Sequence, residues 1–155
     1  HSSIDDFLNS ISTAIKGVSG ILIQFPLYFG IMGVMTSSGL VYIFSDFFVS
    51  ISTELTYPIY TMISAGIVNI FVPSGGGQWA VQAPIILQAA YELGVPFEKT
   101  IMAFVYGDQL TNMLQPFWAL PLLGITGLKA RQILPYTMLI MLGGLFIFLT
   151  GIIVF

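Results

Sequence analysis

The sequence predicts an all-α membrane protein whose transmembrane helices include a re-entrant hairpin and a broken helix. The 155 residues are 56% hydrophobic and only 7% charged, whereas a soluble domain carries roughly 25% charged residues. The few charged residues form clusters that long apolar stretches separate. Two of these stretches are interrupted by glycine, proline and amide residues, which predicts irregular backbone inside the membrane.

The composition also argues against several classes of function. The sequence contains no cysteine, which excludes disulfides, thiolate metal sites and cysteine nucleophiles. It has no basic patch for a nucleic acid. Its one histidine is His1, so Ser74 lacks the base that an intramembrane hydrolase would need. We therefore expect neither an enzyme nor a nucleic-acid-binding protein, and no organic cofactor.

The N-terminal part predicts a surface helix at about residues 3–16 and a membrane span at residues 17–44. Apolar residues recur at helical spacing in the first segment, and Asp5 and Asp6 lie in its first turn, where the helix dipole favours acidic groups. This pattern is typical of a helix on the membrane surface. The solvated start of a spanning helix would show the same pattern. The second segment is long enough to cross the bilayer with some tilt.

Residues at about 50–93 predict a re-entrant hairpin. The first arm is apolar up to Val72, and residues 73–78 (PSGGGQ) then interrupt it. The second arm has about fifteen residues, or roughly 22 Å of helix, which is short for a hydrocarbon core of about 30 Å. No charged residue lies between Thr56 and Tyr91. We therefore expect both arms to open on the same side of the membrane.

The remaining sequence predicts a broken helix at residues 99–126 and a span at residues 132–155. Residues 107–116 place seven polar or helix-breaking groups near the middle of the first segment. The second is apolar and uncharged. Helix ends with unpaired carbonyl groups are expected near Val72 and Tyr106, and helix starts with unpaired N–H groups near Trp79 and Pro116. Lys and Arg accumulate on the cytoplasmic side, which predicts a multi-pass topology with Lys99 outside.

The two interruptions define a candidate site for a carboxylate and a coupling ion. Unpaired N–H groups suit a carboxylate, and unpaired carbonyl groups suit a cation. A carboxylate within a span costs at least about 2.5 kcal/mol unless it is paired, hydrated or protonated, so an acidic residue there is a candidate for binding Na⁺ or a proton. The candidate substrate-binding residues are Ser74, Gly75, Gly76, Gly77, Gln78, Trp79, Thr111, Asn112 and Gln115. The candidate coupling-ion residues, for Na⁺ as for a proton, are Asp108, Asn112 and Gly76.

Structural roles compete with these assignments. The three glycines permit positive φ and a close approach to a ligand, but they also suit a tight turn. Trp79 could line an acyl pocket or pack in the core. Asp108 could be satisfied by Thr111 and Asn112 as a helix cap.

Two long stretches resemble signature sequences of the bacterial short-chain fatty acid transporter family, which is part of the ion transporter superfamily. They are residues 72–82 and 106–121, and residues 15–20 and 122–131 resemble the family too. Members of the superfamily resemble one another in having two inverted repeats, each with a re-entrant hairpin and a broken helix. The resemblance implies symport of short monocarboxylates such as butyrate or acetoacetate across the bacterial inner membrane. It places residues 74–78 at the hairpin tip and residues 108–115 at the unwound joint.

The chain departs from the family pattern because it holds only the C-terminal repeat. Alternating access requires two repeats around a shared site, so we expect the fragment alone to be inactive. Its expected partners are the lipid bilayer, the small carboxylate, and either the missing N-terminal repeat or further copies of itself. The alternative function is a homo-oligomeric membrane channel, in which loops from several subunits form a filter.

Overall fold

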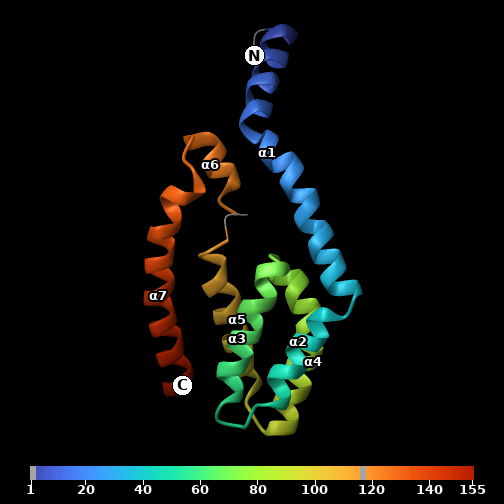
Figure 1. The fold of residues 1–155 in the computed structure, drawn as a ribbon, viewed down its shortest axis with the longest axis vertical. Coiled ribbons are helices and arrows are strands. Elements are labelled where there is room, and N and C mark those ends of the chain that lie inside the picture. Colours follow the sequence, from blue (N-terminus) through green and yellow to red (C-terminus); the bar gives the residue numbers. More distant parts are fainter. Residues whose placement is uncertain (1–2, 116–117) are drawn as a thin grey trace.

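The computed structural model describes residues 3–115 and 118–155, and every regular element in them is a helix (Figure 1). This confirms the all-α fold. The helices are α1 (Ile4–Ser37), α2 (Leu40–Ser50), α3 (Tyr57–Phe71), α4 (Gly75–Leu93), α5 (Phe97–Asn112), α6 (Leu120–Thr126) and α7 (Ala130–Val154).

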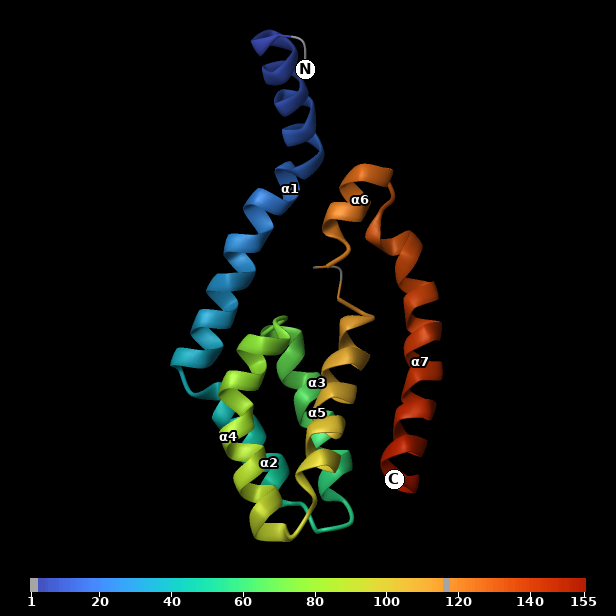
Figure 2. The ribbon, with the colours of Figure 1, turned by 180° about the vertical axis from the view of Figure 1, so that it is seen from behind.

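Helices α2 to α5 form the best-packed part of the chain, in the lower half of Figure 1. α3 and α5 share the largest contact, and α2 packs on α3 and α4. α7 lies along α5, and α6 lies against α1. Both views show the N-terminal part of α1 extending away from the other helices (Figure 1, Figure 2).

Glycines allow α3 and α5 to cross in close contact. A Cβ atom at Gly107 in α5 would lie 2.1 Å from the carbonyl oxygen of Met62 and 2.9 Å from the Cβ atom of Ala65, both in α3. A Cβ atom at Gly66 in α3 would lie 3.2 Å from Cγ2 of Thr111 and 3.3 Å from the carbonyl oxygen of Gly107. Small residues let membrane helices approach backbone to backbone, and Gly107 leaves no room for a larger residue.

Among the described residues, one helix, α7, is long and apolar enough to cross a membrane by itself. Phe25–Ser37 and Leu40–Ser50 satisfy the same criteria only when they are taken together, and they are bent by 58° at their junction. α3 is apolar but shorter. The length and composition of the helices therefore mark one clear spanning candidate in this part of the protein.

The helix bounds near the N-terminus differ from the expected ones. α1 runs without a break from Ile4 to Ser37, although a surface helix at 3–16 and a span at 17–44 were expected. The chain leaves the helix at Gly39, which has a φ of 76°. Glycine adopts this left-handed conformation without a steric cost and commonly ends helices. Gly39 was expected to be a packing residue within the segment 17–44, but it follows the end of α1.

The expected start of the helix after the glycines was wrong. α4 begins at Gly75 rather than near Trp79, because Ser74 is its N-cap and Ser74 Oγ accepts a hydrogen bond from the Gly77 amide at 3.3 Å. Gly75, Gly76 and Gly77 are helical, and positive φ occurs among the described glycines only at Gly39, Gly94 and Gly127. The first turn of a helix therefore stands where an irregular loop was expected.

The expected helix end near Tyr106 was also wrong. α5 continues through Asp108 to Asn112, because α3 supplies hydrogen-bond partners to its polar groups. α6 then begins at Leu120. The helix start expected near Pro116 lies outside the described residues.

The α3–α5 crossing predicts that Gly107→Ala destabilises the protein. An added methyl group must displace the backbone of α3, and overpacking of this kind costs about 1–3 kcal/mol or more. We expect a lower melting temperature for the full-length protein in detergent. The matched control is Gly143→Ala in α7, where no described atom lies within 4 Å of the added carbon. Equal melting temperatures for both variants would contradict the crossing.

Candidate functional site

The candidate site lies where the first turn of α4 meets the last turns of α5. Both carboxylate oxygens of Asp108 lie 3.9 Å from the position that a Cβ atom of Gly75 would occupy. The first turn of a helix presents unpaired N–H groups and partial positive charge, which stabilise a nearby carboxylate. The fold therefore places the carboxylate of Asp108 in α5 beside the positive end of α4.

Asn69 in α3 holds the C-terminal end of α5. Its side chain is fully buried at 0% exposure, and its Nδ2 lies 2.9 Å from the carbonyl oxygen of Asp108, from Thr111 Oγ1 and from Asn112 Oδ1. The two hydrogens of Nδ2 are shared among these three acceptors. The backbone carbonyl of Asn69 accepts a hydrogen bond from Gln115 Nε2. With Gln115, one buried residue thus contacts four positions of residues 108–115 and supplies partners to this polar stretch.

The two carboxylate oxygens of Asp108 differ in their partners. Oδ2 accepts a hydrogen bond of 3.1 Å from Asn112 Nδ2. Oδ1 is buried and has no hydrogen-bond partner among the described residues. An unpaired buried carboxylate oxygen is costly, so Oδ1 is the atom of this site best placed to receive a cation or a proton.

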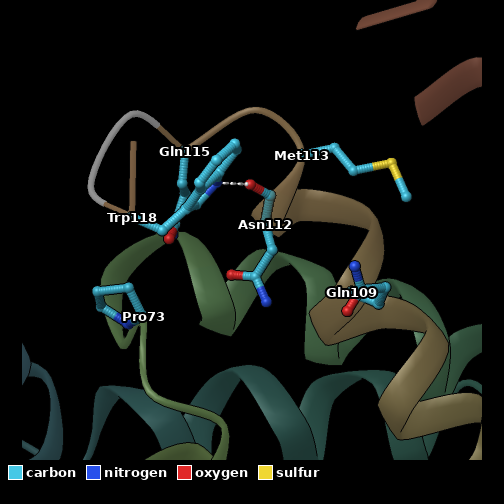
Figure 3. Close-up of a pocket in the computed structure, with 6 residues that line it drawn as sticks. All are labelled: Pro73, Gln109, Asn112, Met113, Gln115 and Trp118. Carbon is cyan, nitrogen blue, oxygen red and sulfur yellow. Dashed lines mark hydrogen bonds between the residues drawn. The ribbon is translucent and has the colours of Figure 1, made fainter. Parts of the chain in front are cut away.

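An open pocket of about 490 Å³ lies at the end of α5 (Figure 3). It is lined by Pro73, Gln109, Asn112, Met113, Gln115 and Trp118. Trp118 Nε1 donates a hydrogen bond to the carbonyl oxygen of Asn112, which places the indole ring over the pocket in Figure 3. Its lining is made of amide, apolar and aromatic side chains, without a charged residue. We call it the amide pocket.

A second open pocket, of about 320 Å³, lies between the start of α4 and α5. It is lined by Gly75, Gly76, Trp79, Ile101, Phe104, Val105 and Asp108. The Trp79 and Phe104 rings meet edge to face with their centroids 5.1 Å apart, so Trp79 also contributes to packing. We call it the apolar pocket, since Asp108 is its one charged lining residue.

The described residues contain no group of three or more His, Cys, Asp or Glu side chains that could hold a metal ion. A sodium ion at Asp108 would therefore take its other ligands from amide, hydroxyl or backbone oxygens.

Several predicted substrate-binding residues do not line either pocket. Ser74 caps α4, and Gly77 lies against it. Thr111 is held by Asn69 and donates to the carbonyl oxygen of Gly107 at 3.3 Å. Gly75, Gly76, Trp79, Asn112 and Gln115 do line a pocket.

Gln78 belongs to a separate buried network that joins α2, α3 and α4. Its Nε2 donates to the carbonyl oxygen of Ala65 and to Gln82 Oε1, both at 2.7 Å. Gln82 Nε2 in turn donates to Ser45 Oγ at 2.8 Å and to Ser64 Oγ at 3.3 Å. Both glutamines are 0% exposed, and this network gives them a structural role.

Sequence analysis missed Asn69, Pro73, Gln109 and Trp118. Asn69 carried a usable signal, because an amide within an otherwise apolar helix has to find polar partners inside the protein. Pro73 and Gln109 lie within the two interruptions of the sequence but were not assigned to the site, and Trp118 lies outside both.

Comparison with known proteins shows similarity along the whole chain. The family model described as "Short chain fatty acid transporter" matches residues 1–155. A protein of Escherichia coli (strain K12) named "Putative short-chain fatty acid transporter" is 42% identical over 149 residues, which are 96% of this chain and 34% of that protein. A protein of Haemophilus influenzae (strain ATCC 51907 / DSM 11121 / KW20 / Rd) with the same name is 40% identical over 152 residues, 98% of this chain and 34% of that protein. The chain thus spans about a third of the length of these relatives. No solved structure matches the chain.

Proposed function

Because this chain belongs to the short-chain fatty acid transporter family, we propose that it is the C-terminal part of a symporter that takes up short monocarboxylates. The family is one of transporters, so the chain is part of a membrane protein and not an enzyme. The proposed location is the bacterial inner membrane, with several passes. The proposed partner is the remaining part of the longer protein, which supplies the other half of the site.

The observation that carries the proposal is the amide pocket beside Asp108. Asn112 and Gln115 line it, and the exposed Gln109 adds a third amide. Neutral amides donate hydrogen bonds to a carboxylate without the strong attraction of a lysine or arginine. Such a site releases its substrate readily, as a transporter requires.

The position of Asp108 supports coupling to a cation or a proton. A substrate carboxylate at Asn112 would lie close to the carboxylate of Asp108, since Asn112 Nδ2 binds Asp108 Oδ2. Two neighbouring carboxylates disfavour each other's charged form. A positive charge on Asp108 Oδ1 removes this repulsion, so substrate and coupling ion bind best together.

The length of α3 supports the proposed membrane arrangement. α3 has 15 residues, or about 22 Å at 1.5 Å per residue, against a hydrocarbon core of about 30 Å. We propose that α3 and α4 form a re-entrant hairpin, that α5 and α6 form a broken helix, and that α7 spans. The interruptions then lie inside the protein, where protein groups can satisfy the backbone.

Asn112→Ala and Gln115→Ala test the substrate site. Each removes an amide donor from the amide pocket, and a hydrogen bond to a charged group contributes about 1.5–3 kcal/mol. We expect the uptake of labelled butyrate by the full-length protein in proteoliposomes to show a KM at least about tenfold higher.

The matched control for this test is Gln88→Ala. Gln88 is an exposed amide on α4 that binds Glu92 and lines neither pocket, so its loss should leave the KM unchanged. Unchanged KM values for Asn112→Ala and Gln115→Ala would contradict the assignment of these residues to the substrate site. Ionic currents without saturable uptake would instead support a channel.

Gly76→Ala tests the proposed ion site at the start of α4. No described atom lies within 4 Å of the added methyl group, and alanine favours a helix by up to about 1 kcal/mol over glycine, so the melting temperature should stay equal or rise. Gly76 lines the same pocket as Asp108, and we expect its added methyl group to raise the coupling-ion concentration for half-maximal uptake. Unaltered ion dependence in this stable variant would place the ion elsewhere.

A further inference from the structure

We infer that Asn69 is a positioning residue for ion coupling: it orients the Asn112 amide so that this one side chain connects Asp108 to the substrate in the amide pocket. The inference rests on the proposed function. It goes further because Asn69 lines neither pocket and acts through another residue.

Asn69 determines which way the Asn112 amide faces. Asn69 Nδ2 is a donor and lies 2.9 Å from Asn112 Oδ1. The nitrogen of Asn112 is therefore directed to Asp108, where Nδ2 lies 3.1 Å from Oδ2. With the amide reversed, two donors would face each other at Asn69 and a carbonyl oxygen would face the carboxylate. Both contacts are unfavourable.

Asn69 is itself held in place. The same Nδ2 also lies 2.9 Å from the carbonyl oxygen of Asp108 and from Thr111 Oγ1. Its Oδ1 is buried without a hydrogen-bond partner among the described residues. A buried acceptor without a partner costs stability, and the hydrogen bonds from Asn69 Nδ2 to α5 offset that cost.

The orientation of Asn112 gives a physical route for coupling. Its Nδ2 carries two hydrogens, of which one serves the carboxylate of Asp108 while the side chain also lines the amide pocket. Asp108 is the one charged side chain that lines either pocket. When an ion occupies Asp108, the carboxylate accepts a weaker hydrogen bond from Asn112. The Asn112 amide then donates more strongly to the substrate. Linkage requires that the substrate raise ion affinity by the same factor.

The test measures butyrate affinity of the full-length protein with and without the coupling ion, by titration with Na⁺ at fixed pH and by change of pH without Na⁺. We expect the ion to raise the affinity of the unmodified protein by about tenfold, within the usual range of coupling between sites. In Asn69→Ala, the ratio of butyrate affinity with the ion to that without it should fall to near one. The matched control is Gln82→Ala, because Gln82 is an equally buried amide that binds Ser45 and Ser64 instead. It should keep the ratio.

The outcomes separate the inference from the proposed function. No butyrate binding by the unmodified protein would contradict the function itself. Weaker binding by Asn69→Ala with the ratio intact would overturn the inference, as would an equal loss of the ratio in Gln82→Ala. Should Asn69→Ala fail to fold, Asn112→Ala at the half-buried end of α5 replaces it. A preserved ratio in that variant would also overturn the inference.

Discussion

The close crossing of α3 and α5 is the constraint on which the rest of the structure depends. Gly66 and Gly107 bring the two backbones together so closely that a Cβ atom at Gly107 would overlap the backbone of Met62. One turn further along α3, this approach brings the amide of Asn69 within hydrogen-bond distance of α5. Apolar packing alone would not satisfy the polar end of α5, because buried polar groups need hydrogen-bond partners. The crossing therefore makes a polar site compatible with an apolar surrounding.

The site that results combines two different pockets. Neutral amides contribute to the lining of one at the end of α5, and Asp108 lines the other, almost wholly apolar pocket at the start of α4. Asn112 lines the first pocket and binds the carboxylate that lines the second. In the proposed function, a short monocarboxylate and a positive charge bind at this site together. The proposed coupling then acts through contacts within one helical turn, so it needs no long path through the protein.

The sequence predicted the helical class. Of the predicted substrate-binding residues, Gly75, Gly76, Trp79, Asn112 and Gln115 line a pocket in the structure. The sequence did not predict the positions of the helix ends, because these depend on tertiary partners. Asp108 looked like a break in the helix, yet α5 continues through it since Asn69 satisfies the neighbouring polar groups. Gln78 looked like a ligand, yet Gln82 and Ala65 hold it in the core. Asn69 lies 43 residues from Asn112 in the sequence, and no local pattern indicates that pairing.

The most direct test of this account is a structure of the complete protein with a bromine-labelled butyrate, located by its anomalous scattering. The account predicts that the carboxylate lies within hydrogen-bond distance of Asn112 and Gln115, with Asp108 within reach of the same amide. A carboxylate bound away from the end of α5, with the Asn69 network unchanged, would contradict it.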